Sequence, residues 1–331
     1  MPGFPRLKES YDFLVIGGGH AGLQAGLKAA LLNYTAALID RGPKYSRSYY
    51  APRMDNIPGF PNGISGHKLL DTQVEAVRAQ DLRVSYFSPA VATAAQRETA
   101  GYSVSFDWLK QSQVARGKVL ILAQGVVDRI IDVGGRIDPI FPWANQGIVD
   151  FCILCDGHEL REKSVAVLGH DAFAARTALD LLHFGVARVE VLTHGQPWLD
   201  GSTDEEHRQL EEELAKHQIG RIEQPTQDFE GIREKQFWVK FADGSIQKYD
   251  RGFSALGWYD MHQTIARGLG ATFDREGYVL TDQDCRVLAA QDQEPIPGLY
   301  AVGDLRSGWN QIPEAWATAE RAVIHAYSEY L

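Results

Sequence analysis

Residues 11–40, YDFLVIGGGHAGLQAGLKAALLNYTAALID, decide how this chain folds. An apolar run, 11–16, is followed by Gly17, Gly19 and Gly22, and then by an Ala- and Leu-rich stretch, 23–32. Short apolar runs rich in β-formers predict buried strands, and the Ala- and Leu-rich stretch predicts a helix. A second apolar run, 35–39, ends at an acid. The order strand, helix, strand is that of a nucleotide-binding βαβ unit.

The glycines in this stretch follow the pattern G-x-G-x-x-G. Gly17 allows a tight turn, Gly19 lets the backbone approach a pyrophosphate, and Gly22 lets the helix pack closely on the strand. The helix N-terminus then faces the anion. Asp40 follows at the end of the second strand, where an acid suits a pair of ribose hydroxyls and not a 2′-phosphate. Between a strand and a helix, the pattern predicts a dinucleotide site and not a turn without a ligand.

A second unit of the same kind follows later in the chain. Residues 165–168 form an apolar run, Gly169 opens a loop, 174–184 have helical spacing, and 189–192 form another apolar run. We therefore predict an α/β fold with two Rossmann-like, three-layer nucleotide-binding domains, the second inserted in the first. The predicted boundaries give one domain of residues 1–126 and 250–331, and an inserted domain of residues 127–249.

Length, charge and hydropathy limit the class of protein. The chain has 331 residues, enough for two domains. Its net charge of −10 argues against nucleic acid as a partner. No apolar run approaches the ~20 residues that span a bilayer, and the first residues lack the apolar core of a secretory signal. We expect a cytoplasmic protein with no membrane partner.

Two of the three cysteines, Cys152 and Cys155, are separated by two residues, and Asp156 follows them. A C-x-x-C sequence near a βαβ unit in a cytosolic protein is typical of a redox pair. The alternative, half of a zinc site, needs further soft ligands nearby. Because Cys285 and the histidines show no ligand spacing, we expect no metal. Asp156 is either a turn residue or a proton donor and acceptor for thiolate chemistry.

A third motif, Gly303-Asp304, follows the apolar run 299–302 and precedes Gln311. A carboxylate at a strand end can accept hydrogen bonds from the ribityl or ribose hydroxyls of a nucleotide. Gly-Asp is also a common turn sequence, so this motif alone is a weak indication.

Taken together, these motifs resemble the low-molecular-weight thioredoxin reductase family over nearly the whole chain. The stretches that carry the resemblance are VIGGGHAG (15–22), DNIPGFPNGISG (55–66), CILCDG (152–157), VAVLG (165–169) and LYAVGD (299–304). The second and third stretches are specific, and the others occur in many flavoproteins. The resemblance implies an FAD held by Gly17, Gly19, Gly22, Asp40, Asn56, Gly303, Asp304 and Gln311.

The resemblance also implies how the parts would work. The domain of residues 1–126 and 250–331 would bind FAD, and the inserted domain would correspond to a pyridine-nucleotide domain that carries the cysteines. Cys155 would face the flavin, Cys152 would attack the disulfide of a thioredoxin-like protein, and Asp156 would move the proton. A homodimer with rotating domains is implied as well.

The inserted domain departs from the family where NADPH would bind. The family has G-x-G-x-x-A there, whereas residues 169–174 read GHDAFA, with Asp171 in place of the second glycine. A carboxylate at that position would repel a pyrophosphate. The next strand ends in THGQ, residues 193–196, without the arginine that grips a 2′-phosphate. We therefore predict that NADPH is not the electron donor.

Several donors and directions remain open at this point. Branches of the family without NADPH motifs take electrons from ferredoxin or place a second FAD in the NADPH-like domain, and Asp171 opposes that second FAD as well. The acidic net charge opposes ferredoxin, although Lys44, Arg47 and Arg53 would form one basic patch. Our leading hypothesis is a disulfide reductase with a donor other than NADPH. The alternatives are a dithiol oxidase that uses oxygen and a flavin-binding sensor without catalysis.

Overall fold

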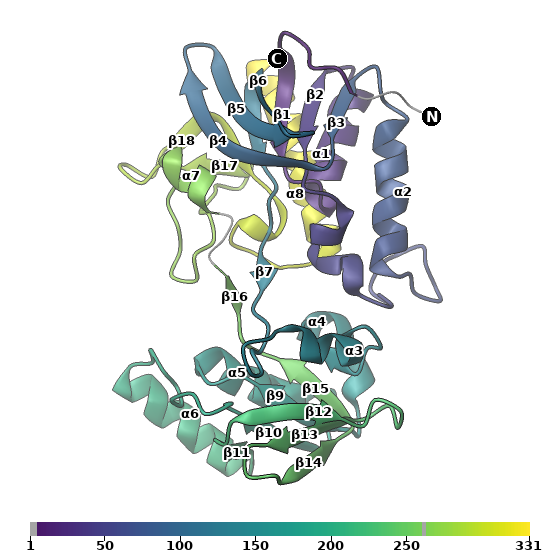
Figure 1. Cartoon of the computed structure of the whole chain (residues 1–331). Coiled ribbons are helices and arrows are strands. Elements are labelled where there is room, and N and C mark those ends of the chain that lie inside the picture. Colours follow the sequence, from purple (N-terminus) through teal and green to yellow (C-terminus); the bar gives the residue numbers. More distant parts are fainter. Residues whose placement is uncertain (1–4, 260–262) are drawn as a thin grey trace. The chain divides into compact units, whose positions relative to one another are not determined.

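The computed structural model describes residues 5–259 and 263–331. The chain forms two compact units (Figure 1). The first unit comprises Met1–Tyr49, Ser65–Val127 and Asp260–Leu331, and the second comprises Tyr50–Ile64 and Asp128–Tyr259. Two short strands that pair with each other, β7 (Val127–Asp128) and β16 (Trp258–Tyr259), lie at the chain positions that connect the units.

The first unit is built on a sheet with the strand order β17-β18-β6-β1-β2-β3. Its strands are β1 (Tyr11–Ile16), β2 (Ala36–Ile39), β3 (Val84–Phe87), β6 (Gln111–Leu122), β17 (Arg286–Leu288) and β18 (Pro295–Ala301). Parallel pairing of β1 with β2 and β6 brings the carboxyl ends of these strands to one edge. An antiparallel hairpin, β4 (Ala90–Glu98) and β5 (Gly101–Trp108), continues the sheet from β6.

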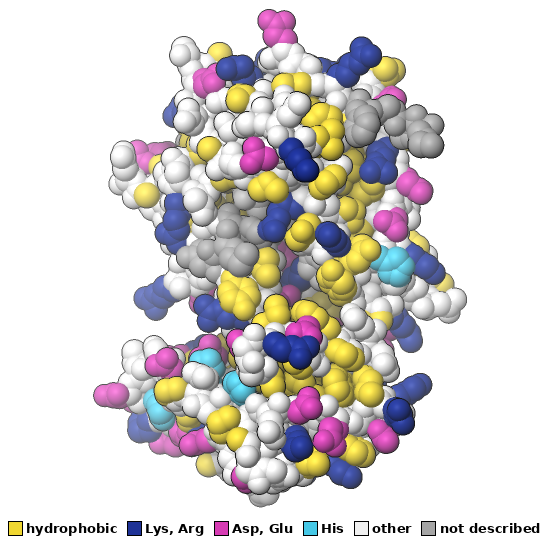
Figure 2. Space-filling model, viewed as in Figure 1, with side chains coloured by type: hydrophobic (Ala, Val, Ile, Leu, Met, Phe, Trp, Pro, Cys, Tyr) yellow, Lys and Arg dark blue, Asp and Glu magenta, His cyan; other side chains and the backbone are white. Residues whose placement is uncertain are grey.

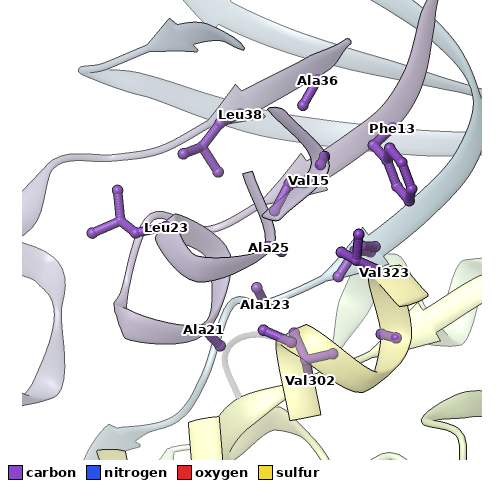
Figure 3. Packing of buried hydrophobic residues seen from close by; sticks show 14 of the residues in the cluster. Phe13, Val15, Ala21, Leu23, Ala25, Ala36, Leu38, Ala123, Val302 and Val323 are labelled. Carbon is purple, nitrogen blue, oxygen red and sulfur yellow. The ribbon is translucent and has the colours of Figure 1, made fainter. Parts of the chain in front are cut away.

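The two faces of this sheet are covered by different layers. Phe13 and Val15 pack against the helices α1 (His20–Leu31), α2 (Gly66–Arg78) and α8 (Ile312–Tyr330) (Figure 3). Leu14 and Ile16 point to the opposite face, where the hairpin and the short helix α7 (Thr264–Gly268) cover them. This alternation follows from the two-residue period of a strand, and it makes residues 13–16 of β1 apolar on both faces.

The second unit repeats this plan. Its parallel sheet has the order β11-β10-β9-β15-β8. The strands are β8 (Val149–Asp150), β9 (Ser164–Leu168), β10 (Arg188–Leu192), β11 (Gly220–Ile222) and β15 (Arg251–Ser254). One face packs against α5 (Ala172–Leu181) and α6 (Asp204–Lys216), and the other against an antiparallel sheet of β12 (Thr226–Glu230), β13 (Phe237–Phe241) and β14 (Ile246–Tyr249). Two one-turn helices complete the unit, α3 (Phe141–Ala144) and α4 (Ile153–Asp156).

The predicted α/β fold with two Rossmann-like three-layer domains is confirmed. The boundaries in the structure differ from those expected. The second unit continues to Tyr259, not 249, because β15 pairs with β8 and β9. The segment Tyr50–Ile64 also belongs to the second unit, although it lies within the first domain in sequence. Among the described residues, every helix is too short or too polar to span a bilayer.

Candidate active site

Two of the motif glycines in the first unit are required by the packing of the chain itself. Gly17 has φ 103°, and a Cβ on it would lie 2.4 Å from the Ala123 carbonyl oxygen. A Cβ on Gly22 would lie 1.8 Å from the Gly17 carbonyl oxygen. A side chain at Gly17 would collide with the backbone that follows β6, and one at Gly22 would collide with the Gly17 carbonyl. Both glycines therefore have a structural reason that needs no ligand.

Gly19 is different, because nothing in the protein requires a glycine there. It is the N-cap of α1 with φ −74°, and no side chain caps the helix at this position. A Cβ on Gly19 would have only the Ser46 Oγ within 4 Å, at 3.6 Å. The open space in front of a helix N-terminus fits the close approach of a diphosphate, and it satisfies the geometric requirement for the FAD that the resemblance implies.

Asp40 lies at the end of β2, as the sequence predicted, and its side chain is 6% exposed. Its carboxylate accepts the Gly18 N–H at 3.0 Å and the Tyr86 O–H at 2.7 Å. Burial, with the negative charge of Asp40, raises the pKa of Tyr86, so this phenol stays a donor. Asp40 therefore fixes the glycine loop itself, and ribose binding by the same carboxylate stays a prediction.

His20, the first residue of α1, is a site residue that the sequence did not reveal. Its Nδ1 lies 2.5 Å from Gln73 Oε1 and its Nε2 lies 2.7 Å from Ser48 Oγ. Burial lowers the pKa of His20 to about 4, so the ring is neutral. Since Gln73 Oε1 can only accept, Nδ1 carries the proton and Nε2 accepts the Ser48 hydroxyl. The edge of Trp316 packs against the ring.

The Gly303-Asp304 motif, which follows β18, also lies in the first unit. Gly303 has φ 64°, and its N–H donates to Thr318 Oγ1 at 3.0 Å. The next residue, Asp304, forms an ion pair with Arg47 at 3.6 Å. Gln311 is the N-cap of α8, and its side chain donates to the Asn310 carbonyl at 3.0 Å.

The remaining predicted cofactor residue, Asn56, is not part of this unit. It lies in Tyr50–Ile64, which packs with the second unit. The structure thus brings seven of the eight predicted residues into the first unit, namely Gly17, Gly19, Gly22, Asp40, Gly303, Asp304 and Gln311.

In the second unit, Cys152 and Cys155 form a disulfide, with their Cα atoms 5.2 Å apart. Cys152 is the N-cap of α4, and its carbonyl accepts the N–H groups of Cys155 at 3.1 Å and Asp156 at 3.0 Å. This single turn brings the two sulfurs together. Asp156 directly follows Cys155 in the chain. Leu154, between the cysteines, is 56% exposed. The bonded sulfurs are not available as zinc ligands.

Close to the cysteines, an exposed group of Asp55, His158 and Glu159 has ligand atoms within 4.8 Å of one another. It is the only group of this kind in the part of the chain that the structure describes. His158 Nε2 lies 3.6 Å from Asp55 Oδ2, and the other Asp55 oxygen is paired with Arg53 at 2.8 Å. Because the Arg53 guanidinium is already paired with Asp55, this group resembles a surface ion-pair cluster more than a metal site.

The second glycine loop ends in a self-capped helix. Asp171 is the N-cap of α5, and its Oδ1 accepts the Ala174 N–H at 3.1 Å. Gly169 is required by packing, since its Cβ would lie 2.5 Å from the Ala255 carbonyl oxygen. Phe173, 41% exposed, packs edge-on against Trp258 at 6.0 Å between ring centroids. The position at which a pyrophosphate would meet the helix thus carries a carboxylate of the protein.

The end of β10 has no basic group for a 2′-phosphate. The His194 Nδ1 accepts the Thr226 N–H at 2.9 Å. The nearest strand, β11, carries Arg221 beside a pocket of about 350 Å³. Its guanidinium already donates to Glu211 at 2.6 Å and to Glu223 at 2.8 Å. This arginine is therefore neutralised by two carboxylates.

Comparisons with known proteins agree with this arrangement. The profile of the family described as pyridine nucleotide-disulphide oxidoreductase matches residues 11–322. The chain is 23% identical to thioredoxin reductase of Listeria innocua over 306 residues, covering 91% of this chain and 87% of that protein. It is 23% identical to thioredoxin reductase of Treponema pallidum over 333 residues, covering 98% of each.

The fold is shared with solved structures. The crystal structure of thioredoxin reductase from Streptococcus pyogenes superposes with a TM-score of 0.76 at 23% identity, covering 96% of this chain and 97% of that chain. The family profile spans both glycine loops and the cysteine pair. The chain belongs to the pyridine nucleotide-disulphide oxidoreductase family, as a thioredoxin reductase-like disulfide oxidoreductase.

Proposed function

We propose that this protein is an FAD-dependent reductase that passes electrons from its flavin through Cys152–Cys155 to the disulfide of a thioredoxin-like protein, with an electron donor other than NADPH. The observation that carries the second half of this proposal is the Asp171 carboxylate at the N-terminus of α5. The observation that supports the first half is the open, uncapped N-terminus of α1.

FAD would be held in the first unit. The N-terminus of α1, with Gly19 as its N-cap, would bind the diphosphate, and Asp304 and Gln311 would bind the hydroxyls of the ribityl chain and the edge of the ring. Asn56 is a further predicted contact, from a segment that packs with the second unit. When bound, FAD supplies a carrier that takes two electrons and delivers them to a disulfide.

Electrons and protons balance as follows. Two electrons break the Cys152–Cys155 bond, and two protons convert the sulfurs to thiols. The Cys152 thiolate then attacks the partner disulfide and releases one partner thiolate, and Cys155 attacks the mixed disulfide and releases the second. Asp156, next to Cys155 in the chain, is the proposed carrier of a proton to and from these sulfurs.

NADPH is disfavoured by charge at close range. A pyrophosphate on α5 would meet the Asp171 carboxylate, which already accepts the Ala174 N–H. Two like charges about 4 Å apart repel by about 4 kcal/mol at an effective dielectric of about 20. The 2′-phosphate finds no compensating cation, since Arg221 is paired with two glutamates.

Ferredoxin and a second FAD are the candidate donors. The basic patch that would attract an acidic ferredoxin is weaker than the sequence suggested, because Arg47 pairs with Asp304 and Arg53 with Asp55. Figure 2 shows basic and acidic side chains interspersed over the described residues of the visible face. A second FAD would have to avoid Asp171. The relatives named thioredoxin reductase support a thioredoxin-like partner, and we further propose a cytoplasmic homodimer.

The first test is an anaerobic titration with NADPH, followed at the flavin absorbance, together with a count of FAD released per chain. We expect no bleaching. One FAD per chain would then favour a protein donor such as ferredoxin, and two would favour a second flavin. Rapid bleaching with one FAD would contradict the proposal, because it would require NADPH to bind despite Asp171.

The second test concerns the cysteines. Cys152→Ser should abolish reduction of a thioredoxin disulfide by dithionite-reduced enzyme, because the attacking sulfur is lost. Cys285→Ala is the matched control, since Cys285 is buried and not disulfide-bonded, and it should retain the rate. Full activity of Cys152→Ser would show that electrons take another route.

A further inference from the structure

Asp150 is a carboxyl group near the disulfide to which the proposed function assigns no role. It is the last residue of β8 and precedes Cys152 by two residues. The register of β8 with β15 pairs Asp150 with Phe253. Neighbouring residues of paired strands point to the same face of a sheet, and so do residues two apart in one strand. Asp150 therefore shares its face with Phe253 and Arg251.

The cysteine segment covers this same face. Phe253 belongs to a core cluster that includes Leu160, and Ile153 packs against the cluster. Ile153 begins α4, and Leu160 ends the following 3-10 helix, Gly157–Leu160. The turn that holds Cys152 and Cys155 thus lies over the sheet face from which Asp150 projects.

Charges around Asp150 come from three elements. Asp156 at the end of α4 and Glu159 in the 3-10 helix bring negative charge, and Arg251 on β15 brings positive charge. The helix α3, which also packs against β8, has the sequence FPWA and carries no charge. The Nε of Arg251 is buried and has no hydrogen-bond partner.

The balance of these effects favours the protonated form of Asp150. Burial, followed by the negative charge of Asp156, raises the pKa of Asp150 well above its usual range, against the smaller opposing effect of Arg251. Two nearby carboxyl groups that cannot both ionise share one proton and titrate as a pair. A proton bound to this pair would lie close to the disulfide.

We propose that Asp150 is a positioning residue for thiol–disulfide exchange, which keeps one proton in a shared carboxyl pair with Asp156 beside Cys152–Cys155. When two electrons break the S–S bond, the one proton of the pair passes through Asp156 to a departing thiolate, and the other sulfur takes its proton from solvent. When a Cys152 thiol ionises to attack the partner, the pair takes the proton back. The inference rests on the proposed function only in that Cys152–Cys155 is reducible, and it is independent of the donor.

The test compares the rates at which dithiothreitol reduces Cys152–Cys155 in the full-length, FAD-loaded protein and in Asp150→Asn, with thiols trapped by alkylation. Asn has the shape of the neutral acid, so the fold should tolerate it. The ratio of variant to wild-type rates should be near one at pH 5, where solvent readily supplies protons. It should fall about tenfold by pH 8, less than the roughly 100-fold loss of a whole proton donor, because Asp156 is retained.

Asp180→Asn is the matched control, because it removes one exposed negative charge from α5 in the same unit, and its ratio should be flat. A flat ratio for Asp150→Asn would overturn the inference alone. A wild-type disulfide that dithiothreitol does not reduce would overturn the proposed function with it.

A second measurement does not depend on a variant that folds. Infrared spectra of the wild-type protein with ¹³C-labelled aspartate should show a protonated carboxyl absorption at pH 7 that shifts when the disulfide is reduced. Absence of this absorption would overturn the inference, because Asp150 would then hold no proton to share.

Discussion

The helices α1 and α5 begin in matching places and in nearly the same backbone conformation, but their N-termini are treated differently. Gly19 caps α1 with φ −74° and ψ −171°, and Asp171 caps α5 with φ −110° and ψ −175°. The first cap has no side chain, and the second accepts a helix N–H with its own carboxylate. An uncapped N-terminus keeps its donors for an external anion, whereas in the capped one a carboxylate of the protein already accepts one of them.

The comparison shows how two loops of the same fold can present different groups to a ligand. Both loops keep the glycine that packing requires, Gly17 in one and Gly169 in the other. Only the position that would meet a ligand differs. One residue therefore gives the second helix a side-chain cap and places a negative charge where a phosphate would approach.

The largest expected effect comes from transferring the second cap to the first helix. Gly19→Asp should weaken FAD binding by roughly a thousandfold, the equivalent of about 4 kcal/mol of repulsion at an effective dielectric of about 20. The fold should persist, since the space at Gly19 is open to 3.6 Å. FAD affinity is measured by fluorescence of the released cofactor. Gly19→Asn, which adds bulk without charge, should bind more tightly than Gly19→Asp; equal losses would show that bulk, not charge, closes the site.

The second-largest expected effect concerns the first residue of each helix, which is His20 in α1 and Ala172 in α5. The pKa of His20 is about 4 in the folded protein, against 6.5 for the ordinary side chain. Below pH 6.5 the unfolded chain takes up a proton that the folded chain refuses. Stability is therefore lost as the pH falls from 6.5 towards 4, by up to ~3 kcal/mol.

Urea unfolding of His20→Asn at pH 7 and pH 4.5 measures this effect. The variant should lose less stability between the two pH values than the wild type. His217→Gln, at an exposed histidine of the second unit, is the control and should follow the wild type. If His20→Asn kept the whole pH dependence, other groups would be responsible for it.

The two helices also differ in packing at the third glycine position of the motif, which is Gly22 in α1 and Ala174 in α5. Gly22→Ala should destabilise the protein by about 2 kcal/mol, within the range for an overpacked core, because its Cβ would lie 1.8 Å from the Gly17 oxygen. The reverse change in the second unit, Ala174→Gly, should lose only about 1 kcal/mol of helix preference. Urea unfolding measures both. A Gly22→Ala loss no larger than that of Ala174→Gly would mean that α1 can move away from β1.

The smallest effect concerns the cap itself. Asp171→Ala should destabilise the second unit by about 1 kcal/mol, since it leaves the Ala174 N–H without an acceptor. Asp171→Asn should be nearly neutral, because Asn is an equally good N-cap. Hydrogen exchange of the first turn of α5 reports the difference. Unchanged exchange in Asp171→Ala would show that the carboxylate has another main role.

Local patterns in the sequence predicted the parts of the site that depend on neighbouring residues. The strand–glycine–helix units, the Cys152–Cys155 pair and Asp171 at the second loop are all recognisable in short windows. Packing between distant segments could not be predicted in this way. The segment Tyr50–Ile64 joins the second unit, and His20 and Asp150 owe their properties to burial by elements far away in sequence.

The sequence also did not predict the antiparallel strands β12, β13 and β14 of the second unit. They are short, and polar residues interrupt them; β12 reads TQDFE and β14 reads IQKY. Only contact with the apolar face of the parallel sheet makes Phe229 and Tyr249 buried. Such strands gain their stability from the layer they cover and not from local preference.

Cys285 provides an internal standard for counting redox equivalents. It is fully buried, and burial raises the pKa of its thiol to about 11, so it reacts poorly with alkylating reagents in the native state. Native protein should therefore expose no reactive thiol when oxidised and two when reduced, while denaturation adds one in either state. The difference between native and denatured thiol counts measures the folded fraction, and the native count alone measures the electrons stored on the cysteine pair.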